Sequence, residues 1–229
     1  INMNSKDKID FIVNWIKNYA DSIKKQPVSL IIGVSGGVDS ALTSTLCANT
    51  GLNTIAISMP IKQNLAQHDL SLKHLDYLKK NFNNVNTKII ELDNIFKTFE
   101  NTMSDFNSEL AFANSRSRLR MVTLYQVAQS NNGIVVGTGN KVEDFGVGFY
   151  TKYGDGGVDI SPIADCNKTE VWELGKELGI LKEIIDAPPT DGLWDDGRTD
   201  EGQLGLNYAD LEEAMNNPNS KNREKYDKI

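Results

Sequence analysis

The spacing of apolar residues divides most of the chain into alternating helices and strands. Apolar side chains recur every three or four positions over residues 9–23, which predicts an amphipathic helix that Gln26 and Pro27 end. Short apolar runs, typical of strands buried on both faces, follow at 28–34, 54–59, 87–92 and 134–137. Helical spacing returns between and after these runs, at 41–48, 65–82, 109–130, 168–178 and 208–215.

Strands that alternate with helices favour a parallel sheet, because each right-handed crossover lays a helix over the sheet. We therefore expect an α/β fold with a doubly wound, mainly parallel sheet and helices on both faces. A chain of 229 residues can bury one large core, so we expect a single domain over 1–229. The polar stretch 216–229 is expected to be a loose tail, and the glycine-rich stretch 140–160 a loop with at most a short hairpin.

Composition narrows the class of protein. The 31 acidic residues exceed the 24 basic ones, and the resulting charge of -7 opposes binding to nucleic acid but leaves a small anionic substrate possible. No stretch approaches the ~20 apolar residues of a membrane span. Residues 1–8 lack the pattern of a secretory signal. We therefore expect a cytoplasmic protein with no membrane partner.

The cysteines and histidines do not suggest a metal site. Cys47 and Cys166 are too few for a disulfide framework and lack C-x-x-C spacing, so we expect two packed thiols in a reducing compartment. His68 and His74 lie six positions apart on a predicted helix, which is a poor spacing for a shared ligand, and we expect both on the surface.

Residues 35–40 carry the strongest chemical signal. They read Ser-Gly-Gly-Val-Asp-Ser, and they stand between a predicted buried strand and a predicted helix. The helix start offers backbone N–H groups, and the two glycines let an anion approach without a Cβ in the way. No Lys-Ser/Thr pair follows, so the turn is not a Walker A loop. Asp39 is instead placed to hold Mg²⁺, with Ser35 and Ser40 donating to phosphate. The alternative is a tight turn with a helix cap.

The motif S-G-G-x-D-S resembles the ATP pyrophosphatase family, whose members cleave ATP between the α and β phosphates. A second segment, 148–160, reads G-F-Y-T-K-Y-G-D-G-G-V-D-I and resembles the NAD synthetases within that family. Further matches follow in the same order along the chain, at 117–121, 137–138, 143, 167–168 and 187–190, so the resemblance covers about 9–215. It implies an adenine nucleotide alpha hydrolase-like fold and an ammonia-dependent ligase.

The resemblance also implies roles for individual residues. The ATP site would comprise Gly33, Val34, Ser35, Gly36, Gly37, Val38, Asp39, Ser40, Thr138, Lys168 and Thr190. Mg²⁺ would be held by Asp39 and Glu143, and deamido-NAD would be contacted by Arg118, Lys152 and Asp159. Asp39, Lys168 and Asp155 would carry the catalysis. The family further implies a homodimer with the substrate near the subunit interface, and free ammonia as nitrogen donor; a separate glutaminase partner stays open.

This chemistry has a simple physical reason. A nicotinate carboxylate is stabilised by resonance and resists ammonia, so it must first displace pyrophosphate from ATP and become a mixed anhydride with AMP. Mg²⁺ and Lys168 would neutralise the charge of the leaving pyrophosphate. The attacking ammonia must be the free base, and either Asp155 or Asp159 would accept a proton.

The chain departs from the family pattern at one point that matters for the metal. Gly139 replaces the aspartate of a G-T-D motif, and the stretch 143–152 is one residue longer than usual. Three alternatives stay open: amidation of nicotinate mononucleotide instead of the dinucleotide, thiolation of tRNA, and nucleotide binding without catalysis. The acidic net charge and the absence of paired cysteines disfavour thiolation of tRNA. The joint presence of Asp39, Glu143 and Lys168 disfavours a non-catalytic module.

Overall fold

Four parallel strands form the centre of the molecule. The structure, a computed structural model, describes residues 3–192, 196 and 198–229. The strands are β1 (Ser29–Gly33), β2 (Thr54–Ser58), β3 (Val85–Ile89) and β4 (Gly133–Val135), in the order β3-β2-β1-β4. Ile31 of β1 is aligned with Ile55 of β2 on one side and Val135 of β4 on the other. The predicted parallel sheet is confirmed.

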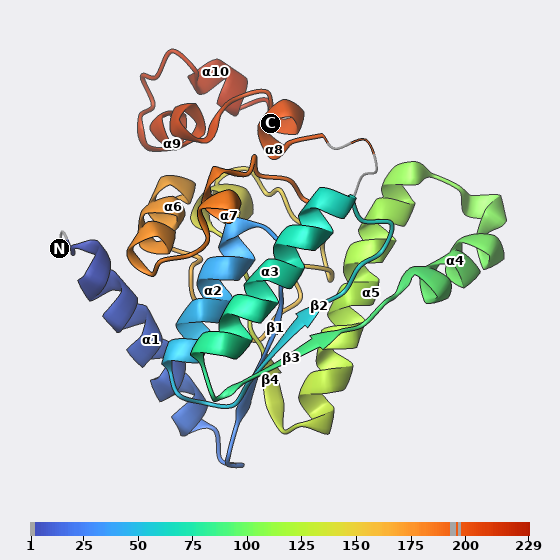
Figure 1. Ribbon diagram of the computed structural model, residues 1–229. Coiled ribbons are helices and arrows are strands. Elements are labelled where there is room, and N and C mark those ends of the chain that lie inside the picture. The colour runs from blue at the N-terminus through green and yellow to red at the C-terminus, as the bar shows by residue number, and fades with distance from the viewer. Residues whose placement is uncertain (1–2, 193–195, 197) are drawn as a thin grey trace.

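Helices cover both faces of this sheet (Figure 1). One face carries α1 (Ser5–Ser22), α2 (Val38–Asn49), α3 (Leu65–Asn81), α6 (Lys168–Glu177) and α7 (Lys182–Asp186). The other carries α4 (Asp93–Thr102) and α5 (Glu109–Ser130), which the short helix η1 (Ser104–Phe106) joins. The last helices, α8 (Asp200–Leu204), α9 (Tyr208–Asn216) and α10 (Arg223–Tyr226), lie together at the top of the view, near the π-helix η2 (Val142–Gly146).

The alternation of side chains along β1 explains the two layers. Leu30 and Ile32 point to one face and pack with α1, α2 and α6, while Ile31 points to the opposite face and packs with α4 and α5. All three side chains are fully buried. A strand that is covered on both faces has a continuous run of apolar residues, and this run in the sequence is what predicted β1.

Most predicted elements are found within a few residues of their expected ends. The long helix α5 has the predicted bounds, whereas β3 begins two positions before the predicted run, at Val85. Helix α4 was not predicted. The stretch 140–160 contains no hairpin among the described residues; it holds the π-helix η2, and Ile160 makes a single parallel bridge to Val136.

Several smaller expectations were also tested. Both cysteines are free and buried, as expected for packed thiols. His74 was expected on the surface, but it is fully buried, and its Nε2 lies 2.9 Å from Ser44 Oγ. No described helix is long and apolar enough to cross a membrane.

The C-terminal stretch 216–229, for which we expected a loose tail, contains α10. The Tyr226 hydroxyl donates to the Gly146 carbonyl at 2.6 Å, which ties this stretch to η2.

Candidate active site

A cavity of about 700 Å³ opens where the carboxyl ends of β1 and β4 meet. From β1 the chain runs outward through β2 and β3, and it returns to the other side of β1 as β4. Ligands of open parallel sheets bind at such a change of direction. The volume suits a nucleotide-sized ligand. Most of the residues assigned to the site by resemblance line the cavity: 33–40, Thr138, Glu143, Asp155, Lys168 and Thr190.

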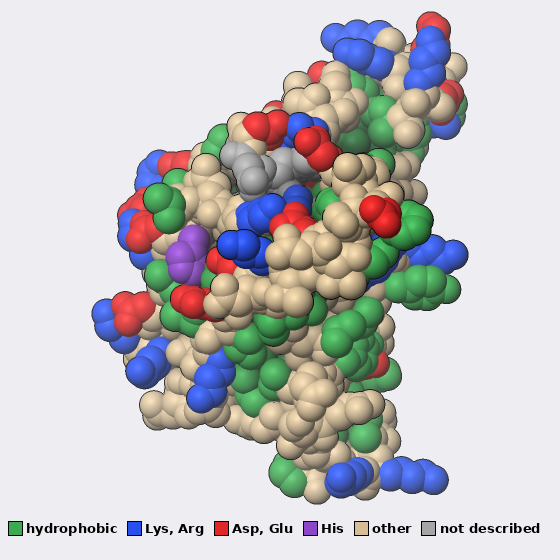
Figure 2. Space-filling view, turned by 90° about the vertical axis from the view of Figure 1, so that its right-hand side faces the viewer, with side chains coloured by type: hydrophobic (Ala, Val, Ile, Leu, Met, Phe, Trp, Pro, Cys, Tyr) green, Lys and Arg blue, Asp and Glu red, His purple; other side chains and the backbone are tan. Residues whose placement is uncertain are grey.

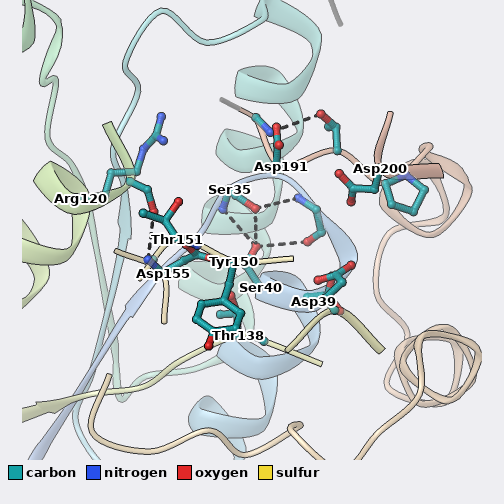
Figure 3. A pocket seen from close by; sticks show the side chains of 18 of the residues that line it. Ser35, Asp39, Ser40, Arg120, Thr138, Tyr150, Thr151, Asp155, Asp191 and Asp200 are labelled. Carbon is teal, nitrogen blue, oxygen red and sulfur yellow. Dashed lines mark hydrogen bonds between the residues drawn. The ribbon is translucent and has the colours of Figure 1, made fainter. Parts of the chain in front are cut away.

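The turn between β1 and α2 is held by its own serines. The Ser40 hydroxyl accepts a hydrogen bond from Ser35 N–H at 3.0 Å and donates to the Gly37 carbonyl at 3.2 Å. Ser35 Oγ lies 3.1 Å from Ser40 Oγ and accepts from Gly37 N–H (Figure 3). The hydroxyls therefore shape the turn, and the unpaired N–H groups at the start of α2 are left for an anion.

Gly36 is required by this geometry for two reasons. Its φ is +94°, a conformation that residues with a side chain rarely adopt. A Cβ at this position would also lie 2.3 Å from the backbone carbonyl oxygen of Gln67, at the start of α3. The turn thus packs against α3 as closely as a glycine permits.

Lys168 joins the two carboxylates that were predicted to hold a metal. Its ammonium group donates to Asp39 Oδ2, and it donates to Glu143 Oε1 at 3.1 Å. The lysine is 1% exposed although it begins α6, where the helix dipole disfavours a positive charge. The two carboxylates supply the compensating charge.

The electrostatics follow from this arrangement. Burial alone would lower the pKa of Lys168, but the charges of Asp39 and Glu143 outweigh burial and raise it above its ordinary value. Burial would likewise raise the pKa of Glu143, but the charge of Lys168 and the hydrogen bond from Tyr208 hold it below its ordinary value. At neutral pH Lys168 is therefore a cation and Glu143 an anion.

Asp39 and Glu143 also fit a hard divalent cation such as Mg²⁺. Their oxygens already converge on one cationic group, the ammonium of Lys168. Within the described ranges no three His, Cys, Asp or Glu side chains form a complete metal site. Two carboxylates are enough for Mg²⁺, which commonly takes one or two from the protein and the rest from phosphate and water.

Several residues of the site had not been predicted. Asn140 is fully buried, donates to Asp39 Oδ1 at 3.1 Å and accepts from Glu143 N–H at 3.1 Å. Tyr208 donates to Glu143 Oε1 at 2.6 Å, and its hydroxyl also lies 3.2 Å from Asp200 Oδ2. Tyr208 comes from a distant segment, whereas Asn140 stands three positions before Glu143. Neither residue is marked by a motif that we recognised in the sequence.

Asp155 lies on the other side of the turn between β1 and α2 from Asp39 and Asp200 (Figure 3). Its Oδ1 accepts hydrogen bonds from Thr151 N–H at 2.8 Å and from Ser117 Oγ at 2.9 Å. Burial raises the pKa of Asp155, and these hydrogen bonds offset part of the increase. A fixed carboxyl group with a raised pKa is suited to accept a proton.

Three predicted substrate residues lie outside this cavity. Arg118 is exposed on α5, and its Nε donates to the Lys152 carbonyl at 3.1 Å. The Lys152 ammonium lies over the ring of Tyr153. Asp159 accepts from Tyr125 and from the N–H of Val135, so it stabilises the end of β4. Trp194, whose glycine- and aspartate-rich surroundings in the sequence are compatible with a cover for the site, lies outside the described residues.

Comparisons with known proteins identify the family of this chain. A family model described as NAD synthase matches residues 8–228. The chain is 36% identical to the NH(3)-dependent NAD(+) synthetase of Finegoldia magna over 228 residues, which cover 99% of this chain and 91% of that protein. It is 40% identical to the protein of the same name from Saccharolobus solfataricus over 210 residues, covering 90% and 72%.

Solved structures show the same likeness. The NMN synthetase of Francisella tularensis superposes with a TM-score of 0.89 at 32% identity, covering 99% of this chain and 92% of that one. The NH3-dependent NAD synthetase of Campylobacter jejuni, in complex with nitrate, superposes with a TM-score of 0.76 at 26% identity, covering 99% and 89%.

Proposed function

This chain belongs to the NAD synthase family, and on that premise we propose that it amidates deamido-NAD to NAD with ATP and ammonia. The reaction passes through an acyl-adenylate and releases AMP and pyrophosphate. One observation carries the proposal: a phosphate-binding turn, the Lys168 cluster and the Asp155 carboxyl group all line a single cavity.

The first step joins the substrate carboxylate to the α-phosphorus of ATP. The oxygen–phosphorus bond forms as the bond between the α and β phosphates breaks, and the pyrophosphate leaves with additional negative charge. The N–H groups at the start of α2 and the ammonium of Lys168 stabilise that charge. Thr138 and Thr190, which also line the cavity, contact the nucleotide.

The site is suited to Mg²⁺ held by Asp39 and Glu143. When bound, this ion neutralises negative charge on the phosphates. Other residues of the chain contribute by holding these two carboxylates in position. Asn140 and Lys168 hold Asp39, while Tyr208 and Lys168 hold Glu143. Both carboxylates are thereby aimed at the same point.

In the second step ammonia attacks the acyl carbon, AMP leaves, and the nitrogen loses a proton. We assign the acceptor of this proton to Asp155 rather than Asp159. Asp155 lines the cavity, whereas both carboxylate oxygens of Asp159 already accept hydrogen bonds within the fold.

We further propose a homodimer formed through α4 and α5. A hollow of about 270 Å³ between these helices is lined mainly by apolar side chains, together with Ser115 and Arg118. Ile95, Phe99 and Val122 around it are 57%, 41% and 55% exposed. This is the face turned toward the viewer in Figure 2, where hydrophobic side chains form patches between charged ones. Contiguous apolar patches of this kind mark association surfaces.

A second copy on this face would also explain the position of Arg118 and Lys152. Both lie beside the apolar surface rather than in the cavity of their own chain. Together with Asp159 they are proposed to contact the dinucleotide at the subunit interface. Each subunit is proposed to be one domain over 1–229, because α9 packs directly against η2 and α6.

Nicotinate mononucleotide is a second candidate substrate. The likeness to the NMN synthetase of Francisella tularensis favours it. The chemistry at the carboxylate would be the same, and only the adenylyl half of the substrate would be missing.

The test is a product assay. The protein is incubated with ATP, Mg²⁺ and ammonium, with deamido-NAD or nicotinate mononucleotide in separate reactions, and the products are identified by mass. AMP and NAD from the first reaction are expected. AMP and nicotinamide mononucleotide mainly from the second would keep the mechanism and change the substrate. Absence of AMP from both would overturn the proposed function.

A further inference from the structure

The hydroxyl of Tyr208 links two carboxyl groups that line the cavity. It lies 2.6 Å from Glu143 Oε1 and 3.2 Å from Asp200 Oδ2. Tyr208 itself is 1% exposed and does not line the cavity. Its hydroxyl can therefore affect the cavity only through these two neighbours.

The number of protons on the Tyr208 hydroxyl and on the two carboxyl groups determines which atom donates in each hydrogen bond. A tyrosine hydroxyl has one proton and accepts through its lone pairs, whereas an ionised carboxylate only accepts. The shorter distance assigns the tyrosine proton to Glu143. Asp200 Oδ2 then faces a lone pair of the tyrosine oxygen, an arrangement that is favourable only when Asp200 carries a proton and donates it.

The surroundings of Asp200 favour this neutral form. The residue is 4% exposed, and its Oδ1 is buried with no hydrogen-bond partner among the described atoms. A buried carboxylate in that position would leave a charge unsolvated. Burial and the nearby charge of Glu143 raise the pKa of Asp200 to about 7, against the opposing effects of Lys168 and of the hydrogen bond with Tyr208. Asp191 adds to the increase.

Tyr208 is held firmly enough to orient its neighbours. Its ring lies 5.0 Å from the Lys168 ammonium and meets Trp172 edge to face at 5.9 Å. One helical turn later, Glu212 accepts from the N–H of Thr169 at 3.0 Å and from its hydroxyl at 2.6 Å. Helix α9 is thus anchored to the first turn of α6, which carries Lys168.

We propose that Tyr208 and Asp200 are positioning residues of the active site. In its protonated form Asp200 donates to the Tyr208 hydroxyl, and Tyr208 donates to Glu143, so that this carboxylate is aimed beside Lys168 and Asp39. The inference rests on the proposed function for its catalytic meaning, but its geometry can be tested without turnover.

The first variant is Tyr208→Phe, which removes one hydroxyl and keeps the ring. The probe is Mn²⁺ together with α,β-methylene-ATP, which cannot be cleaved between the α and β phosphates. Binding of Mn²⁺ is followed by electron paramagnetic resonance. We expect Mn²⁺ affinity to fall by about 10- to 100-fold, the usual effect of losing a group that orients a metal ligand. kcat is expected to fall by a similar factor, with a smaller change in KM for the nicotinate substrate.

Tyr226→Phe is the matched control. It also removes one tyrosine hydroxyl, but this hydroxyl donates to the backbone of Gly146. Little change in Mn²⁺ affinity is expected. An equal loss in both variants, or affinity and kcat within twofold of the wild type for Tyr208→Phe, would overturn the positioning role.

The second comparison sets Asp200→Asn against Asp200→Ala. The amide of Asn can donate to Tyr208 as a neutral carboxylic acid does, so Asp200→Asn is expected to retain metal affinity within about threefold, while Asp200→Ala falls with Tyr208→Phe. Equal loss in both Asp200 variants would overturn the neutral-donor assignment. If the wild type forms no AMP, the proposed function fails, and the Mn²⁺ measurements still decide this inference.

Discussion

The carboxyl group of Asp144 occupies the space beside Gly139. A Cβ on Gly139 would lie 2.0 Å from Asp144 Oδ2. Burial and the charge of Glu143 raise the pKa of Asp144 to about 7. An aspartate at 139, as in the G-T-D motif of relatives, would therefore compete with Asp144 for the same place.

We predict that Gly139→Asp destabilises the protein, and that Asp144→Ala in the same chain restores much of the loss. Placing two partly buried carboxyl groups in one space is expected to cost about 2 kcal/mol. A double-mutant cycle of urea unfolding measures the coupling. Additive effects of the two substitutions would contradict the competition.

Asp39→Ala is predicted to abolish AMP formation and leave the fold intact. Lys168 keeps its ion pair with Glu143, so no buried charge is left without a partner. AMP release and a circular dichroism spectrum check the two halves of this prediction. Substantial remaining turnover would remove Asp39 from the proposed metal site.

Lys168→Met is predicted to be destabilising as well as inactivating. The substitution leaves Asp39 and Glu143 buried together without their cation, at a cost of about 3 kcal/mol. Because protonation of either carboxylate relieves this cost, the loss is expected to shrink at pH 5. Urea unfolding of both proteins at pH 5 and pH 8 provides the measurement; an equal loss at both values would contradict the electrostatic explanation.

The raised pKa of Asp200 leads us to expect that the stability of the protein depends on pH. Its pKa is raised to about 7 by burial and by Glu143, above the ordinary value of about 3.9 for an unfolded chain. Between these values the folded state binds more protons, so this residue makes stability fall as pH rises from about 4 to about 7.

The check is the difference in unfolding free energy between the wild type and Asp200→Asn. We expect the wild type to lose about 2.6 kcal/mol relative to the variant between pH 5 and pH 8. A constant difference would show that Asp200 does not change protonation in this range.

A new charge on the proposed dimer face can be compared with a new charge elsewhere on the surface. Val122→Glu places a charge on the apolar face of α5 and is expected to weaken the dimer by about 100-fold, because burying an unpaired charge costs about 3 kcal/mol. Phe11→Glu is the control, since Phe11 is 59% exposed on α1, on the opposite side of the sheet. Sedimentation velocity measures both. Dimers of unchanged affinity in Val122→Glu would exclude this face.

Local patterns predicted the sheet and the turn between β1 and α2 because their physical causes are local. A buried apolar run precedes Gly36, and a helix follows it, all within a few residues. The start of α6 was also predicted, because Glu170 accepts from the N–H of Asn167 only three positions away. Such short-range pairs leave a readable spacing in the sequence.

The rest of the site depends on contacts between residues far apart in the sequence, which produce no recognisable motif. Tyr208 reaches Glu143 across 65 positions, and nothing near either residue marks the other. His74 has polar neighbours typical of a surface helix, yet the packing of α3 on α2 places it beside Ser44 in the interior. The extra residue of 143–152 was visible in the sequence, but the π-helix η2, which overlaps the start of this stretch, was not.

The order of the strands also determines how substrate binding affects folding. Leu30 of β1 is aligned with Thr54 of β2 and with Ile134 of β4, which is far away in sequence. The nucleotide cavity therefore exists only after these distant segments have met, and the unfolded chain has nothing equivalent to offer. ATP should bind the folded state alone. At a concentration about 100-fold above its dissociation constant it would add about 2.7 kcal/mol to stability, so the cellular nucleotide supply would protect the enzyme against unfolding.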